Sequence, residues 1–130
     1  MARITQLTVS TPSRPGVLAR ICSTLAGAGV NLSGICAAEV GGRGKIRMVV
    51  SDPAKAKQAL ADAKIRSGEE PALLLTLEDR PGTVAQIAQR LAAARINIKC
   101  AYATTPAGAG GSAQIVVVVA NPDKAERALG

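Results

Sequence analysis

The chain has 130 residues, of which 48% are hydrophobic and 19% charged, a composition typical of a globular protein with an apolar core. It contains no histidine, and its three cysteines lack a CxxC spacing, which argues against a zinc site and a disulfide framework; no cofactor is expected. The net charge of +7 invites a nucleic-acid interpretation, but the 16 Lys and Arg residues are scattered, so solubility is the favoured explanation.

The sequence contains no apolar run approaching the roughly 18 residues that a membrane span needs. Its first residues also lack the basic region and apolar region of a signal peptide. We therefore expect a cytoplasmic protein with no membrane partner.

The first half of the chain alternates between the period of two typical of strands and the longer period of helices. Leu7 and Val9 are expected to be buried on one face of the first strand. In chain order we expect a strand at 4–10, a turn at 11–14, a helix with Pro15 at its first position and glycines 27 and 29 at its end, a strand at 30–40, a hairpin loop at 41–44, a strand at 45–51, a helix from Pro53 to about 63 capped by Asp52, and a short strand at 65–70 that Pro71 interrupts or kinks.

The same pattern then starts again. We expect a strand at 72–77, a helix at 81–94, a strand at 96–104, a Gly-rich loop at 106–111, a strand at 113–120 and a helix from Pro122 capped by Asn121. Residues 14–37 and 80–103 are identical at ten of 24 positions, which indicates an internal duplication.

Each copy follows a βαββαβ order. Right-handed crossovers then predict the α+β class, with two ferredoxin-like units whose antiparallel sheets carry both helices on one face. The expected domains are 1–70 and 71–130. Because no residues follow the second helix of the second copy, we expect that unit to lack its own fourth strand, which leaves its first strand at an apolar edge.

This fold supports many functions, so the side chains must decide between them. RNA-binding modules of this topology stack bases on aromatic residues of the two central strands, whereas here those strands carry Lys45, Arg47, Val116 and Val118. Tyr102, the only aromatic residue, is expected on an edge strand. No acid–base or nucleophile set is apparent, because histidine is absent and the cysteines are expected to be packed. We therefore expect neither nucleic-acid binding nor enzymatic activity.

A strand-to-helix turn, Arg-Pro-Gly, occurs once in each copy, at 14–16 and 80–82. Gly16 and Gly82 allow close approach to the backbone, and the amides that follow, those of Val17 and Leu18 or of Thr83 and Val84, are helix N-terminal donors that attract an anion. Each helix is followed by an asparagine, Asn31 or Asn97, which offers a donor and an acceptor. The alternative is a tight turn followed by an asparagine that bonds local backbone.

These residues resemble the ACT domain, a regulatory module that binds amino acids. The resemblance rests on the Pro-Gly turn, the Ala-rich helix and the apolar-Asn-apolar triplet. The two runs Asn31–Glu39 and Val50–Ala56 are similar to stand-alone tandem ACT proteins with no attached enzyme. It implies that a small amino acid binds at an interface between ACT units and contacts Ser13 and Asn31, or Asp79 and Asn97. A further family contact, often histidine, falls on Thr11 and Leu77, which departs from the serine-binding pattern.

The two copies differ around their turns. Ser13 is neutral, whereas Asp79 would repel a nearby carboxylate, so the first copy is expected to hold the better site. The open sheet face of the first copy carries Thr8, Lys45 and Arg47, and that of the second carries Leu74, Val116 and Val118. The apolar second face and edge predict homodimerisation through the second copy.

The resemblance implies a non-enzymatic regulator that senses an amino acid and acts on a metabolic enzyme or a transcription factor. The alternative is a dedicated regulatory subunit of an amino-acid biosynthetic enzyme, for example in a branched-chain pathway. An enzyme or ligand carrier is a third hypothesis that no residue set supports. The cluster of Arg43, Lys45 and Arg47 fits solvated strand charges, or a dock for an acidic partner or phosphate.

Overall fold

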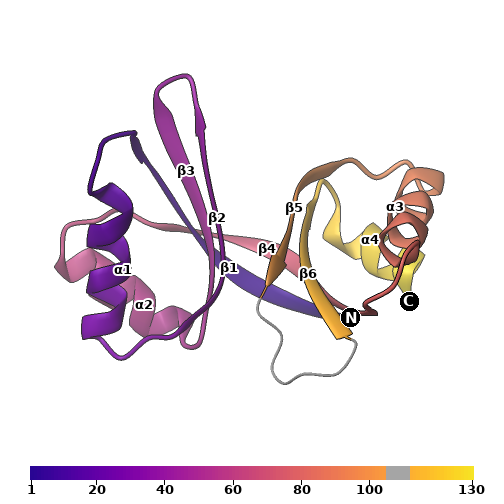
Figure 1. Cartoon of the computed structure of the whole chain (residues 1–130), viewed down its shortest axis with the longest axis horizontal. Coiled ribbons are helices and arrows are strands. Elements are labelled where there is room, and N and C mark those ends of the chain that lie inside the picture. Colours follow the sequence, from indigo (N-terminus) through magenta and orange to yellow (C-terminus); the bar gives the residue numbers. More distant parts are fainter. Residues whose placement is uncertain (105–111) are drawn as a thin grey trace. The chain divides into compact units, whose positions relative to one another are not determined.

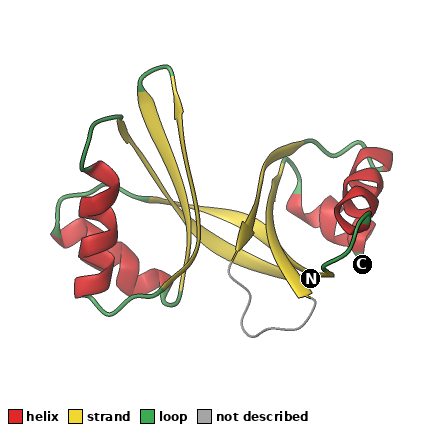
Figure 2. Cartoon of the chain, viewed as in Figure 1, coloured by secondary structure: helices red, strands yellow, loops and turns green. Residues whose placement is uncertain are grey.

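The computed structural model describes residues 1–104 and 112–130, so the Gly-rich loop expected at 106–111 lies outside the described residues. Figure 2 shows the helices and strands; their order along the chain is the predicted one, except that the strands expected at 65–70 and 72–77 form one strand. The elements are β1 (Ala2–Pro12), α1 (Val17–Gly27), β2 (Leu32–Val40), β3 (Arg43–Val50), α2 (Pro53–Asp62), β4 (Gly68–Glu78), α3 (Thr83–Ala93), β5 (Ile98–Thr104), β6 (Ser112–Val119) and α4 (Pro122–Leu129).

The chain forms two compact units, and β1 and β4 contribute to both (Figure 1). The first unit is Thr5–Glu70, and the second is Met1–Ile4 together with Pro71–Gly130. Strands follow the order β2-β3-β1-β4 in the first unit and β1-β4-β6-β5 in the second. Each unit also holds two helices, which confirms the α+β class with two ferredoxin-like units. The domain limits 1–70 and 71–130 stay a prediction.

The core of the first unit lies between its sheet and its two helices. Leu7 pairs with Met48 across the antiparallel β1 and β3, and both side chains are buried. The β2–β3 hairpin turns through Gly41 and Gly42, whose φ angles of 60° and 78° suit the two-residue turn that glycine favours. Buried side chains of the strands and helices form one cluster: Leu7, Val9, Ile21, Leu25, Val30, Ile46, Met48, Val50, Ala56 and Leu60.

The core of the second unit repeats this arrangement. Its buried cluster is Leu73, Leu75, Leu91, Ile96, Val117, Val119 and Ala125. Asn121 caps α4 by accepting a hydrogen bond from the amide of Lys124 at 3.0 Å, as Asp52 caps α2 by accepting from the amide of Lys55 at 3.1 Å. Both caps and the proline that follows each of them were predicted from the sequence.

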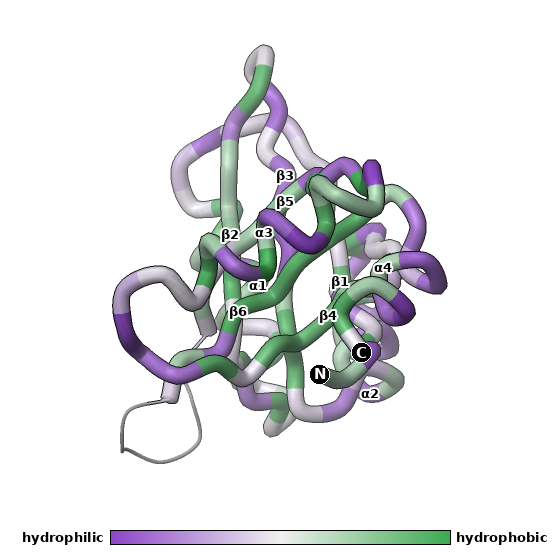
Figure 3. The backbone as a smooth tube through the Cα atoms, turned by 90° about the vertical axis from the view of Figure 1, so that its right-hand side faces the viewer, coloured by the Kyte–Doolittle hydropathy of each residue, from purple (hydrophilic) through white to green (hydrophobic). Residues whose placement is uncertain are grey.

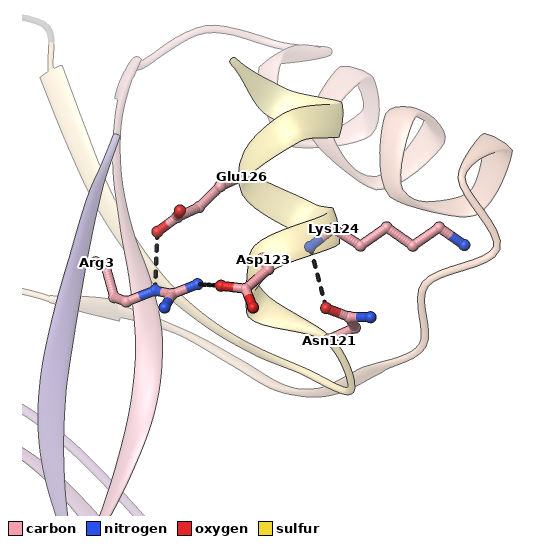
Figure 4. Close-up of polar contacts among 5 residues, drawn as sticks. All are labelled: Arg3, Asn121, Asp123, Lys124 and Glu126. Carbon is pink, nitrogen blue, oxygen red and sulfur yellow. Dashed lines mark hydrogen bonds and ion pairs between the residues drawn. The ribbon is translucent and has the colours of Figure 1, made fainter.

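The first four residues of the chain are tied to α4 within the second unit. The guanidinium of Arg3 lies 2.6 Å from Asp123 and 2.9 Å from Glu126 (Figure 4). Its hydrogen bond and charge hold the pKa of Asp123 below the ordinary value of an aspartate. The N-terminal part of β1 thus takes the place of the fourth strand that the second copy lacks.

Two sequence-based expectations about β4 are wrong. Pro71 does not interrupt the strand, because β4 runs through it from Gly68 to Glu78. Proline fits extended backbone, and the β4–β6 ladder begins only at Leu73. The first strand of the second copy is not at an edge either, because β4 has β1 and β6 as neighbours.

The apolar face expected on the second sheet is present but not exposed. Val116 and Val118 are 0% and 3% exposed and lie outside the cluster that packs against α3 and α4. Figure 3 shows the hydrophobic run of β6, in which residues of both faces are apolar. We expected homodimerisation through the second copy partly because of an exposed apolar face. Val116 and Val118 are buried, so these two residues do not supply such a face.

The open face of the first sheet is polar. Gln6 is fully buried, and its side-chain amide donates to a carboxylate oxygen of Glu70 at 2.7 Å. The guanidinium of Arg47 donates to the same oxygen at 2.8 Å. The sequence suggested that Arg47 is one of a set of solvated strand charges, but its guanidinium pairs with Glu70. Its partner comes from β4, which the local sequence pattern of β3 cannot reveal.

Within the described ranges, no helix is long and apolar enough to cross a membrane. The same residues contain no cluster of three or more His, Cys, Asp or Glu side chains that could hold a metal ion. Cys22, Cys36 and Cys100 are half-buried thiols that form no disulfide.

Candidate functional site

The Arg-Pro-Gly turn of the first unit is held in a conformation that needs glycine. Gly16 has φ of 89° and is the N-cap of α1, so the helix begins at Val17. We expected Pro15 to be the first helical residue, but it lies in the turn before the helix. The same correction applies to the second unit, where Gly82 has φ of 92° and α3 begins at Thr83.

These turns leave donors at the start of each helix. The amide of Val17 donates to the carbonyl of Arg14 at a long 3.4 Å, whereas the amide of Leu18 has no hydrogen-bond partner among the described residues. The expectation of two unpaired amides therefore holds for Leu18 but only partly for Val17. An N-terminal amide without a partner carries the positive end of the helix dipole and attracts anions.

The first turn of each helix exposes apolar side chains. Leu18 and Val84 are 42% and 55% exposed. Val17, by contrast, packs against the core of the first unit.

A cleft of 190 Å³ lies beside the first turn and is contained within the first unit. It is lined by Thr11, Pro12, Ser13, Arg14, Val17, Leu18, Ala37, Ala38, Glu39, Gly44 and Ile46. Four of these, Thr11, Ser13, Val17 and Leu18, were predicted from the sequence to contact a ligand, and the structure brings them together. Gly16 supplies the turn that aligns them.

The β2–β3 hairpin closes the other side of this cleft. Thr11 pairs with Gly44 across β1 and β3, and Glu39 pairs with Gly44 across β2 and β3, so strand register places the hairpin beside the turn. The amide of Ser13 donates to the carbonyl of Gly42 at 3.0 Å and fixes the two segments together. The side chain of Glu39 is exposed and has no ion-pair partner among the described residues. Sequence reasoning missed Glu39 because its position depends on register rather than on a motif.

Asn31 does not line this cleft. It follows the opposite end of α1, a helix of 11 residues that is about 16 Å long. Its backbone amide already donates to the hydroxyl of Ser51 at 2.9 Å, and its carbonyl accepts from the amide of Ser51. Its side-chain amide forms no hydrogen bond with a described residue, so this amide can still bond a ligand.

The second turn is closed by its own side chains. The hydroxyl of Thr83 lies 2.8 Å from the carbonyl of Glu78 and can donate to it, and the guanidinium of Arg80 pairs with the carboxylate of Glu78 at 2.6 Å. In the first copy, Val17 and Pro12 occupy the places of Thr83 and Glu78, so neither contact can form. Asp79 is exposed beside this turn.

The cleft beside the second turn is smaller and apolar. Its volume is 40 Å³, and it is lined by Leu75, Leu77, Val84, Ile87, Ala88, Leu91, Ile98, Ala101, Ile115 and Val117. Of the predicted contacts of the second copy, only Leu77 and Val84 line it, whereas Asp79, Gly82, Thr83 and Asn97 do not. The backbone carbonyl of Asn97 accepts from the amide of Ala120 at 3.1 Å.

Comparison with known proteins places the chain in a family. Residues 2–129 match the family described as ACT domain pair. The chain is similar in structure to protein BT0572 from Bacteroides thetaiotaomicron, with 28% identity and a TM-score of 0.87 over 98% of this chain and 86% of that chain. It shares its fold with the regulatory subunit of aspartate kinase from Thermus thermophilus, with 18% identity and a TM-score of 0.66 over 99% of this chain and 95% of that chain. No curated protein matches the chain.

Proposed function

The chain belongs to the ACT domain pair family, and from this premise we propose that it is a non-enzymatic regulatory protein that binds a small amino acid at the turn of residues 14–16. The observation that carries the proposal is the 190 Å³ cleft beside this turn. A helix N-terminus, a hydroxyl and a carboxylate meet around one space, and no comparable set surrounds the cleft of the second unit among its described residues.

The polar groups of the cleft match the two charged ends of an amino acid. The amide of Leu18 and the hydroxyl of Ser13 are the donors for the ligand carboxylate, supported by the dipole of α1 and the charge of Arg14. The carboxylate of Glu39 is the acceptor for the ligand ammonium. The site thus binds the backbone groups that all amino acids share.

The size of the cleft favours a ligand with a short side chain. Its 190 Å³ is below the roughly 300 Å³ at which sites for drug-sized molecules begin. The apolar residues that line it, Val17, Leu18 and Ile46, leave little to hydrogen-bond a polar side chain. We therefore expect a small apolar or nearly apolar amino acid.

The placement of Asn31 bears on assembly. The family resemblance implies that this asparagine contacts the ligand, yet it lies beyond the opposite end of α1 from the cleft. A second copy of the chain can supply it, so we propose a homodimer in which ACT units of two chains share the ligand. We expect the second copy to hold the weaker site, because only Val84 lines its cleft among the predicted contacts Asp79, Gly82, Thr83, Val84 and Asn97.

The regulator acts in the cytoplasm on a metabolic enzyme or on a transcription factor. The alternative is a dedicated regulatory subunit of one biosynthetic enzyme. The fold shared with a protein named as a regulatory subunit of aspartate kinase favours keeping this alternative. Co-purification of one stoichiometric catalytic partner would select it over a free regulator.

A thermal-shift screen of the twenty amino acids tests the proposal. A ligand at 100 times its Kd adds about 2.7 kcal/mol to the free energy of unfolding, which is a measurable rise in Tm. We expect one or a few small amino acids to raise Tm in the wild type, and Glu39→Gln to reduce the effect. Asp79→Asn is the matched control, because it removes the carboxylate near the second turn. No shift with any amino acid at millimolar concentration would reject the proposal.

A further inference from the structure

A second cleft lies on the other side of the first turn, and seven of its ten lining residues take no part in the proposed amino-acid site. It has a volume of 250 Å³ and is contained in the first unit, between the end of β1, the start of α1 and the segment that follows α2. It is lined by Val9, Ser10, Thr11, Arg14, Val17, Arg20, Ile21, Lys64, Ile65 and Arg66.

Four of the ten lining residues are cations, and none is an acid. Arg14, Arg20, Lys64 and Arg66 form no ion pair with any described residue. Other cations of the same unit are neutralised, since Arg47 pairs with Glu70 and Lys57 pairs with Glu69. The cleft therefore gathers positive charge that the described part of the protein leaves uncompensated, and like charges in one concave space repel unless an anion lies between them.

The main chain positions the segments that carry these cations. A guanidinium nitrogen of Arg20 donates to the carbonyl of Ala63 at the end of α2, which draws that side chain across from α1. Lys64 follows Ala63, the C-cap of α2, and its backbone amide donates to the carbonyl of Ala61 at 2.9 Å. Arg14 lies in the turn fixed by Gly16. Three separate segments thus converge on the cleft.

The second copy lacks this arrangement. Gln86 stands where the first copy has Arg20, and Arg80, the counterpart of Arg14, pairs with Glu78 at 2.6 Å. The first copy has Pro12 at the position of Glu78, so Arg14 has no neighbour of this kind. The charge cluster is therefore a property of the first unit and not of the repeated fold.

We propose that this cleft binds a small multivalent anion, for which inorganic phosphate is the simplest probe. Guanidinium groups bind phosphate and carboxylate oxygens in a forked geometry, and the cleft is also lined by the polar residues Ser10 and Thr11. The volume of 250 Å³ admits a small anion but not a polymer. The cleft shares Thr11, Arg14 and Val17 with the amino-acid cleft, whereas Lys64 and Arg66 line only the anion cleft of the two.

Titration calorimetry of the full chain with inorganic phosphate, at an ionic strength held constant with sodium chloride, tests this inference. We expect saturable binding that Arg66→Gln and Arg14→Gln each weaken about three- to fivefold, as for the loss of one partly exposed charge pair. Arg80→Gln is the matched control, because it removes the same charge from the equivalent turn of the second copy, and it should bind phosphate as the wild type does.

Equal weakening by Arg80→Gln would overturn the inference, because it would reduce phosphate binding to an effect of net charge. Absence of saturable binding of both millimolar phosphate and citrate would also overturn the inference. Binding of citrate without binding of phosphate would support an anion site that selects carboxylates. Titration with glycerol 3-phosphate and citrate thus separates a phosphate ester from a tricarboxylate. Arg66→Gln should leave amino-acid binding unchanged, so failure of this proposal and failure of the proposed function are distinguishable.

Discussion

Two helices are followed, just after the C-cap residue, by a long cationic residue at a position where the backbone favours glycine. Replacing that residue with glycine should therefore raise the stability of the protein. Lys64 follows α2 with φ of 62°, and Arg95 follows α3 with φ of 58°. In each case the next amide reaches back across the last turn, from Ile65 to Leu60 at 2.8 Å and from Ile96 to Leu91 at 2.9 Å. This is the Schellman arrangement, in which the left-handed residue is usually glycine.

The magnitude follows from the conformation. A side chain in the left-handed region costs about 1–2 kcal/mol, and the freedom of glycine in the unfolded chain returns roughly 0.5–1 kcal/mol of that cost. Both side chains are exposed and form no hydrogen bond or ion pair with a described residue, so little contact is lost. We therefore expect Lys64→Gly and Arg95→Gly each to add about 0.5–1 kcal/mol to the free energy of unfolding, or roughly 2–5 °C in Tm.

Urea unfolding followed by circular dichroism measures the effect. The two changes should add in the double variant, because the residues share no described partner. Gly29→Ala is the reverse control: Gly29 ends α1 with φ of 74° at the position that matches Arg95, so alanine there should lower stability. A loss of stability in both glycine variants would refute the conformational argument. Lys64→Gly, but not Arg95→Gly, should also weaken phosphate binding.

Three further predictions concern two polar contacts and the oligomeric state. Arg3→Gln should lower Tm near neutral pH, and because the folded pKa of Asp123 lies below its unfolded value, the difference should vanish as pH falls through that folded pKa; a pH-independent difference in melting scans would contradict this linkage. Glu70→Ala should cost about 1–3 kcal/mol in urea unfolding, because the buried Gln6 and the half-buried Arg47 lose an acceptor; a cost below about 0.5 kcal/mol would contradict the role of this network. Sedimentation at tens of micromolar should detect a homodimer, and a monomer at that concentration would reject the shared amino-acid site.

The order of strands and helices was predictable because it depends on local patterns. Asp52-Pro53 and Asn121-Pro122 each mark a helix start in the sequence, and the structure confirms both caps. The start of α1 was predicted too early because Pro15 resembles a first helical residue, whereas the positive φ of Gly16 delays the helix. A proline's preference cannot reveal the conformation of the glycine after it.

Contacts between distant segments were not predictable from the pattern. Arg3 pairs with Asp123 and Glu126 across most of the chain, so the strand that supplies the second unit could not be found by inspecting the second copy alone. Glu39 joined the candidate site through strand register. Ser13 was found from the family resemblance because its position relative to Gly16 is fixed within a few residues.

Titration calorimetry with the amino acid that most raises Tm tests the central claim most directly, using wild type, Ser13→Ala and Asp79→Ala. Loss of the Ser13 hydroxyl removes one hydrogen bond worth about 0.5–1.5 kcal/mol, or about two- to tenfold in Kd. The first-turn site predicts this weakening in Ser13→Ala and unchanged affinity in Asp79→Ala. Wild-type affinity in Ser13→Ala together with loss of binding in Asp79→Ala would contradict it and assign the ligand to the second turn.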